Sequence, residues 1–258
     1  MTLNALVLYG YGINTEHESK YSIEKSGGKA DIVHLNKILE TPKILENYNM
    51  LMVPGGFAFG DDLGSGKVFG NKMKYHLSEQ LSEFITAGKL IMGVCNGFQI
   101  VVKMGLLPKP DFKQRVSLTT NDSGHYEDRW VILKTNKDSP CVFTKDLDYM
   151  FVPVRHGEGK FIPKDEQTLK ELKEKNQVVF QYVDENGTLA GFPHNPNGSV
   201  DNIAGICDES GRIFGMMPHP EAFNIPENSP YWVKGAVKEP LGLRLFKNAV
   251  DYAKISGI

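Results

Sequence analysis

One cysteine in this sequence stands where a strand, a tight turn and a helix are expected to follow one another. Cys95 lies in Gly93-Val94-Cys95-Asn96-Gly97, after an apolar run and before residues with helical spacing. Glycines at 93 and 97 remove the Cβ atoms that would crowd such a reversal, as in the Gly-x-Ser-x-Gly turns that expose a serine. A thiol at a helix N-terminus is favoured as thiolate by the backbone dipoles. An arbitrary cysteine is more often a small core residue, but the paired glycines favour a nucleophile here.

A histidine and a glutamate two residues apart are the natural partners of this thiol. They lie in Met217-Pro218-His219-Pro220-Glu221, which follows an apolar strand pattern. In an extended segment, residues two apart point to the same side, and Pro220 restricts the backbone between them. Glu221 would then fix the tautomer of His219 and leave the second ring nitrogen for Cys95. An isolated His-x-Glu is usually a solvated pair, but beside this turn it predicts a Cys-His-Glu relay.

Other stretches that could do chemistry are weaker signals. Residues 60–67 resemble a phosphate-binding loop, but Asp61 stands at the first glycine position and Val68 at the hydroxyl position, which excludes a nucleoside triphosphate site. Gly10-Tyr11-Gly12 lacks the third glycine of a dinucleotide fingerprint and is interpreted as a tight turn. His156-Gly157-Glu158-Gly159 offers two metal ligands without a third, which is more typical of pocket lining or a loop. No metal site is predicted.

The composition is that of an ordinary globular protein. Of 258 residues, 41% are hydrophobic and 23% charged, enough for a sizeable core. The net charge of -2 comes without a basic stripe, so neither nucleic acid nor a membrane surface is an expected partner. We find no apolar run long enough to span a membrane and no signal-peptide pattern. Three cysteines without a C-x-x-C fit reduced thiols in a cytoplasmic protein, with Cys141 and Cys207 structural.

The elements that must position these residues alternate between strands and helices in the first part of the chain. We expect strands at 5–9, 30–35 and 49–53, helices at 15–25 and 72–87, and then the strand that carries Cys95. This alternation predicts an α/β fold with a parallel sheet covered on both faces, whose ligands bind at the carboxyl ends of strands. Both Gly55-Gly56 and Cys95 fall at such ends.

From residue 108 onward, shorter strands predict a mixed or antiparallel extension of the same sheet. They are expected at 115–119, 129–134, 149–154, 177–183, 203–207 and 213–217, with one polar helix at 164–174. Pro240 is expected as the first residue of a final helix with Leu241, Leu245, Phe246 and Ala249 on one face. Since no linker rich in Pro, Gly or Ser separates the halves, residues 1–258 are predicted to form a single domain.

Together these stretches resemble a known family. The turn Pro54-Gly55-Gly56-Phe57, the Cys95 turn and the His219-Pro220-Glu221 run are similar to motifs of the class I glutamine amidotransferases. Residues 156–159 and 195–199 point to the glutaminase subunits of phosphoribosylformylglycinamidine synthase. The resemblance covers nearly the whole chain and implies a flavodoxin-like three-layer fold. It implies Cys95, His219 and Glu221 as the triad, and as substrate-binding residues Gly55, Gly56, Phe57, Asn96, Gln99 and His156, with backbone N–H groups near Gly56 and Asn96 binding the oxyanion.

The resemblance also implies a reaction and partners. The chain would hydrolyse glutamine to glutamate and ammonia, and pass the ammonia to a separate synthetase subunit. That subunit would convert formylglycinamide ribonucleotide to formylglycinamidine ribonucleotide with ATP, in de novo purine biosynthesis, and a small third subunit would bridge the two. ATP and Mg²⁺ are expected on the synthetase and no cofactor on this chain. The alternatives are another class I glutamine amidotransferase, a stand-alone thiol amidase or peptidase-like protein of the same fold, and a glutamine sensor that binds without catalysis.

The sequence departs from the expected family pattern at two places. In relatives we expect an aromatic residue and an arginine around positions 62–64, and an arginine where this chain has Ala222. The loop at 222–239 is also long. The unusual loop concerns the surface that would face a partner, and the residues implied in the chemistry lie outside all of these departures.

Overall fold

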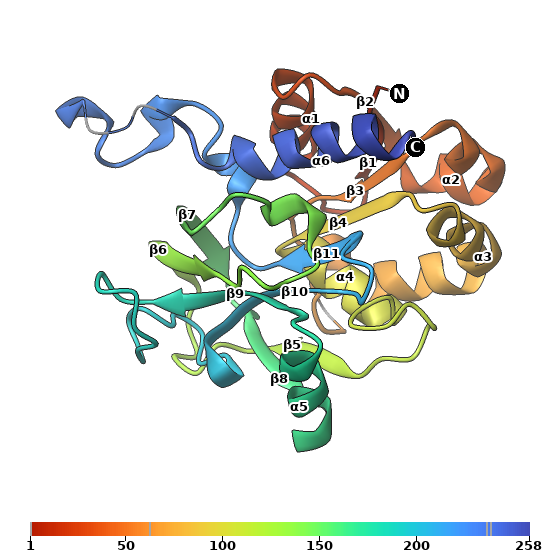
Figure 1. Ribbon diagram of the computed structural model, residues 1–258. Helices are drawn as coiled ribbons and strands as arrows, with labels where there is room; N and C mark the ends of the chain where they lie inside the picture. The colour runs from red at the N-terminus through yellow and green to blue at the C-terminus, as the bar shows by residue number, and fades with distance from the viewer. Residues whose placement is uncertain (1, 62, 236, 238) are drawn as a thin grey trace.

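The chain is organised around one large sheet, whose central strands position the candidate site (Figure 1). The computed structural model describes residues 2–61, 63–235, 237 and 239–258. Nine strands follow the order β2-β1-β3-β4-β11-β10-β9-β6-β7. The parallel part comprises β2 (Lys29–His34), β1 (Asn4–Tyr9), β3 (Met50–Val53), β4 (Leu90–Val94) and β11 (Ile213–Met216). The antiparallel part comprises β10 (Ile203–Cys207), β9 (Val178–Val183), β6 (Glu127–Thr135) and β7 (Tyr149–His156). The predicted α/β fold with an antiparallel extension is thus confirmed.

Helices cover both faces of the parallel part (Figure 1). Helix α1 packs against α6, and on the opposite side α3 packs against α4. The α-helices are α1 (Glu16–Lys25), α2 (Leu35–Glu40), α3 (Lys67–Thr86), α4 (Asn96–Met104), α5 (Glu166–Glu174) and α6 (Leu243–Ser256). Short 3-10 helices are η1 (Pro42–Asn47), η2 (Ala58–Asp61), η3 (Val142–Thr144), η4 (Val200–Asn202), η5 (Pro220–Ala222), η6 (Pro226–Asn228) and η7 (Trp232–Lys234). A separate two-stranded sheet pairs β5 (Val116–Thr119) with β8 (Lys160–Pro163).

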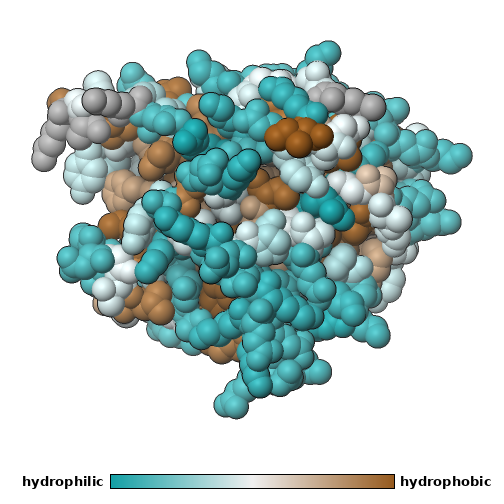
Figure 2. Space-filling model, viewed as in Figure 1, coloured by the Kyte–Doolittle hydropathy of each residue, from teal (hydrophilic) through white to brown (hydrophobic). Residues whose placement is uncertain are grey.

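The hydrophobic pattern explains this layering. Strands β3 and β4 are apolar and buried at every position, as expected for strands covered on both faces. Helix α5, in contrast, buries only Leu172, and the region around it is almost entirely hydrophilic in Figure 2. One buried hydrophobic core runs along the parallel strands and continues through the antiparallel strands, and α5 lies at its edge. Among the helices of the described residues, none has the length and apolar composition that a membrane span requires.

The register of three parallel strands brings the candidate residues to one edge of the sheet. Val53 of β3 pairs with Gly93 of β4, and Met216 of β11 pairs with Val94. The segments that follow these strands therefore begin at the same level. They are the Pro54–Phe57 turn, Cys95 and the run from Met217 to Glu221.

Two predicted helix starts are wrong. Helix α3 begins at Lys67 instead of 72, because Gly66, in the left-handed region, ends the preceding turn. The last helix begins at Leu243 and not at Pro240. Here the chain passes directly over η5, since a Cβ at Gly242 would lie 1.9 Å from the Pro220 carbonyl oxygen. Pro240 and Leu241 form a turn ahead of α6, in which the Leu243 N–H donates to the Pro240 carbonyl oxygen at 3.0 Å, and Leu245, Phe246 and Ala249 of α6 are buried on one face as predicted.

The described residues of the loop at 222–239 extend away from the central sheet (the blue segment at the upper left of Figure 1). Tyr231, Trp232 and Val233 are exposed on it. The departure expected around position 62 falls partly on Asp62, which lies outside the described residues, as do Ala236 and Lys238 of this loop.

Candidate active site

Cys95 occupies the sharp reversal that the sequence predicts between β4 and α4. Its backbone has φ 51 and ψ -109, a strained conformation for a residue with a Cβ, of the kind that concentrates at functional sites. The two glycines beside it allow this turn. A Cβ at Gly97 would lie 1.8 Å from the Val53 carbonyl oxygen, and one at Gly93 would lie 2.7 Å from the Gly97 carbonyl oxygen. This sharp reversal at Cys95, called the elbow below, forms because the backbone at Gly93 and Gly97 lies closer to neighbouring carbonyl groups than a side chain at either position would permit.

His219 and Glu221 form a buried pair beside this thiol. His219 Nδ1 lies 2.6 Å from Glu221 Oε1, and Glu221 is fully buried. The predicted geometry of this segment is wrong, however. The two residues are not extended but flank Pro220 at the start of the 3-10 helix η5, and this turn brings the carboxylate back to the ring. The His219 N–H donates to the Pro153 carbonyl oxygen at 2.8 Å, which fixes the segment against β7.

The surroundings of His219 favour its charged form. Burial disfavours the imidazolium, but the carboxylate of Glu221 and the sulfur of Cys95 outweigh burial and raise the pKa of His219 well above its usual value. Its Nε2 is buried and makes no hydrogen bond of standard geometry to any residue that the structure describes. That nitrogen is therefore free to exchange a proton with a group that enters beside Cys95.

The Pro54–Phe57 turn is fixed by the loop that follows β1. The Gly55 N–H donates to Thr15 Oγ1 at 2.9 Å, and the Asn14 N–H donates to the Gly55 carbonyl oxygen at 3.1 Å. The Phe57 N–H donates to the Gly12 carbonyl oxygen at 2.8 Å. Gly10-Tyr11-Gly12, which the sequence suggested to be only a tight turn, therefore belongs to the loop that supports the Pro54–Phe57 turn. The sequence did not reveal this supporting role.

Two backbone donors remain for a ligand near Cys95. The N–H groups of Gly56 and Asn96 find no acceptor within the described part of the chain. Gly55 lies between the two catalytic candidates, since a Cβ there would come within 2.8 Å of His219 Cε1 and 3.5 Å of Cys95 Cβ. The predicted donors at Gly56 and Asn96 thus lie on the two segments that meet at the thiol.

The side chains of Asn96 and Gln99 join neighbouring loops to α4. Asn96 Oδ1 accepts the Ala58 N–H at 3.0 Å, and Asn96 Nδ2 donates to Gln99 Oε1 at 2.8 Å. Gln99 Nε2 in turn donates to the Glu158 carbonyl oxygen at 2.5 Å. Both side chains are buried. They hold the turn after β3 and the loop after β7 in place, and their predicted contact with substrate stays a prediction.

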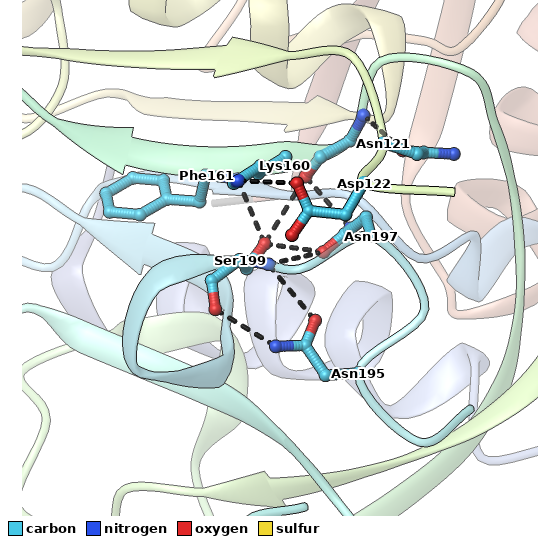
Figure 3. A network of polar contacts seen from close by, with 8 residues as sticks. Asn121, Asp122, Lys160, Phe161, Asn195, Asn197 and Ser199 are labelled. Carbon is cyan, nitrogen blue, oxygen red and sulfur yellow. Dashed lines mark hydrogen bonds and ion pairs between the residues drawn. The ribbon is translucent and has the colours of Figure 1, made fainter. Parts of the chain in front are cut away.

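His156 lies in a polar network that sequence patterns did not predict, and Figure 3 shows the part of this network around Asn121, Asn197 and Ser199. Its Nδ1 lies 3.2 Å from Asn121 Oδ1, and its Nε2 lies 3.4 Å from Asn197 Nδ2. The loop at 195–199, which alone looked like an ordinary turn, is the other half of this network, and Ser199 Oγ accepts the Phe161 N–H at 2.9 Å. Both ring nitrogens are engaged, so His156 does not offer a metal ligand. Within the described residues, no three His, Cys, Asp or Glu side chains gather in a way that could hold a metal.

Two exposed aromatic side chains, Phe57 and Tyr126, lie close to each other. Phe57, whose substrate contact stays a prediction, is exposed, and its ring lies 6.2 Å from that of Tyr126. Burial and then the sulfur of Cys95 raise the pKa of Tyr126, which places its hydroxyl within electrostatic reach of the thiol. Cys141 and Cys207 lie elsewhere: both are buried free thiols, and Ser139 Oγ lies 3.6 Å from Cys207 Sγ. Of the three sulfurs, only Cys95 adjoins His219.

Comparisons with known proteins identify the family. Residues 2–253 match the model of the CobB/CobQ-like glutamine amidotransferase domain. Phosphoribosylformylglycinamidine synthase subunit PurQ of Methanococcus maripaludis strain S2 is 47% identical over 263 residues, with 96% of each chain covered. The subunit PurQ of Dehalococcoides mccartyi strain 195 is 42% identical over 255 residues, with 98% of each chain covered.

A solved structure supports the same relationship. A chain of PurLQS from Thermotoga maritima superimposes with a TM-score of 0.74 at 30% identity, and the match covers 98% of this chain and 99% of that chain. The chain therefore belongs to the glutamine amidotransferase family and, within it, to the PurQ subunits of phosphoribosylformylglycinamidine synthase.

Proposed function

We propose that Cys95, His219 and Glu221 act as a catalytic triad that hydrolyses glutamine. The observation that carries this proposal is the 2.6 Å contact between His219 Nδ1 and Glu221 Oε1, which leaves Nε2 free beside a thiol on a strained elbow. The chain is the glutaminase subunit of phosphoribosylformylglycinamidine synthase and serves purine biosynthesis.

In the proposed reaction, the Cys95 sulfur attacks the side-chain amide carbon of glutamine. A C–S bond forms, and the carbonyl oxygen takes up negative charge beside the N–H groups of Gly56 and Asn96, each worth about 3 kcal/mol in comparable sites. His219 gives its Nε2 proton to the leaving nitrogen, the C–N bond breaks and ammonia departs. The same imidazole then removes a proton from water, whose oxygen attacks the thioester carbon; the C–S bond breaks, glutamate is released, and the Cys95 thiolate beside the protonated His219 is restored. Glu221 holds the ring in one tautomer throughout.

The ammonia is used by a separate synthetase subunit. Formation of an amidine from a formamide requires that the formamide oxygen become a leaving group, for which ATP is the expected activator. We propose that the synthetase binds formylglycinamide ribonucleotide, ATP and Mg²⁺, that a small third subunit bridges the complex, and that this chain needs no cofactor of its own. A solved complex of PurLQS from Thermotoga maritima supports such a partnership. We further propose that the chain works in the cytoplasm, and recovery of the protein from another compartment of fractionated cells would contradict this.

Substitution of Cys95 tests the proposed function. In the complex assembled with its synthetase partners, Cys95→Ala should abolish product formation from glutamine while ammonia still supports it. The matched control is Cys207→Ala, which removes a thiol outside the site. If Cys95→Ala lowered both activities equally, the thiol would be a structural residue.

We also propose that the oxyanion turn at Gly55-Gly56 reaches its productive geometry only when the synthetase docks. A free glutaminase would release ammonia that no partner uses, and catalysis depends steeply on placement. Glutamate release should therefore be slow for the purified chain and rise on addition of the partners with their substrates. Rapid release by the chain alone, unchanged by the partners, would favour a stand-alone amidase.

A further inference from the structure

The orientation of Asn121 determines which nitrogen of His156 carries a proton. Asn121 Nδ2 donates to the carbonyl oxygens of His125 and His156 at 2.9 and 2.8 Å. Its Oδ1 therefore points the other way, where the Gly159 N–H donates at 3.0 Å and His156 Nδ1 lies at 3.2 Å. Because an amide oxygen only accepts hydrogen bonds, Nδ1 must be the protonated nitrogen.

Asn197 fixes the other nitrogen in the opposite role. Asn197 Oδ1 accepts from the Ser199 N–H at 3.0 Å and from Ser199 Oγ at 2.7 Å (Figure 3). Its Nδ2 donates to the Gly159 carbonyl oxygen at 2.9 Å and faces His156 Nε2 at 3.4 Å. An amide NH₂ only donates, so Nε2 must carry the lone pair.

The two amides together select the neutral Nδ1–H tautomer of His156. A second proton would place an N–H of Nε2 against the NH₂ of Asn197. Burial and then the positive charge of His219 act in the same direction and lower the pKa of His156 to about 3. His156 is thus an uncharged neighbour of the histidine that carries charge in the site.

The end of strand β7 contacts two residues of the triad, His219 and Cys95. The Pro153 carbonyl oxygen accepts the His219 N–H at 2.8 Å, and the Arg155 carbonyl oxygen lies 3.5 Å from Cys95 Sγ. The next carbonyl oxygen, that of His156, is the one that Asn121 holds. Bonds to the backbone and ring of His156 therefore anchor the stretch that contacts both Cys95 and His219.

We propose that His156 is a positioning residue, which Asn121 and Asn197 hold as the neutral Nδ1–H tautomer so that strand β7 keeps Cys95 and His219 in place. It acts through Arg155 and Pro153 and touches neither glutamine nor the reacting atoms. The inference rests on the proposed glutaminase function and replaces the expectation that His156 binds substrate.

A spectroscopic test addresses the tautomer without any need for activity. Nitrogen chemical shifts of isotope-labelled histidine in the full chain, assigned with His156→Gln, should show a protonated Nδ1 and an unprotonated Nε2 for His156 from about pH 5 to pH 9. A proton on Nε2, or titration near the ordinary histidine value, would overturn the assignment. The nitrogen resonances of the exposed His76, assigned with His76→Gln, serve as the internal reference in the same spectra.

Kinetics of the assembled complex test the positioning role. His156→Leu removes one hydrogen-bond partner from each of two buried amides, so kcat for glutamine hydrolysis should fall about tenfold or more while KM changes about twofold at most. His156→Gln supplies an uncharged donor and acceptor and should recover kcat to within about threefold of the wild type. A rise of KM with unchanged kcat in His156→Gln would show that His156 binds substrate. Equal loss of kcat in both variants would show that His156 acts as an acid or base. Either result would overturn the proposal.

A third readout separates positioning from a general loss of structure. Alkylation of Cys95 by iodoacetamide in the isolated chain should slow about fivefold or more in His156→Leu and in Asn197→Leu, but not in His76→Gln. Unchanged alkylation with a lowered free energy of unfolding would show a merely structural role. If the wild-type complex released no glutamate, the proposed glutaminase function would be wrong. The nitrogen chemical shifts and the alkylation rates would still decide the role of His156.

Discussion

Replacement of Gly55 by alanine tests whether the turn beside the triad holds the catalytic imidazole in one place. A Cβ at this position would lie 2.8 Å from His219 Cε1, whereas ordinary contacts begin at 3.4 Å. The ring must therefore move by about 0.6 Å, the difference between these two distances. The 2.6 Å bond to Glu221 opposes this movement. Since a misplacement of about 1 Å can reduce a rate about 100-fold, we expect kcat for glutamine hydrolysis to fall about 10- to 100-fold.

The assay is glutamate release by the assembled complex, with ammonia-dependent synthesis as a measure of intact assembly. Gly55 does not lie in the left-handed region, so the free energy of unfolding should fall by only the about 1–3 kcal/mol typical of overpacking. Gly191→Ala is the matched control, because a Cβ there meets nothing within 4 Å. A kcat within about twofold of the wild type would show that the imidazole tolerates displacement and would refute this reasoning.

Three further predictions concern the elbow, the turn and pH. Gly97→Ala would place a Cβ 1.8 Å from the Val53 carbonyl oxygen, so urea unfolding should show a loss of about 3 kcal/mol or more, and a stable variant would contradict the close approach. Thr15→Val removes the acceptor of the Gly55 N–H and should lower kcat about tenfold with KM nearly constant; a change in KM alone would place this loop at the substrate and not behind the turn. Because the pKa of His156 is about 3 when folded and about 6.5 when unfolded, stability is lost as the pH falls below about 6.5. The loss should reach about 2 kcal/mol at pH 5, and urea unfolding of His156→Gln should show a correspondingly smaller acid loss than the wild type.

Sequence patterns predicted the parts of the site that local rules control. The reversal at Cys95 was predictable because Gly93 and Gly97 allow backbone contacts that other residues forbid. The pairing of His219 with Glu221 was predictable from their types and spacing. The parallel half of the sheet followed from alternating apolar and helical segments, and the three free cysteines agree with the expectation of reduced thiols.

The remaining features depend on contacts between distant segments. Thr15 supports Gly55 across 40 positions, and Asn121 reaches Gly159 across 38. No pattern within either segment reveals its partner. The His219–Glu221 pair formed through a 3-10 turn because Pro220 begins η5, a local geometry that the alternation rule for strands does not cover. The close approach of Gly242 to the Pro220 carbonyl oxygen is likewise a contact between segments that no pattern within residues 240–243 reveals.

The proposed reaction requires that Cys95 be the nucleophile that attacks glutamine. Its most direct test is treatment of the assembled complex with a glutamine-like electrophile, followed by peptide mass mapping. We predict one labelled site, Cys95, with protection by glutamine and loss of glutaminase activity in proportion to labelling. Label on Cys141 or Cys207 in place of Cys95 would contradict the claim.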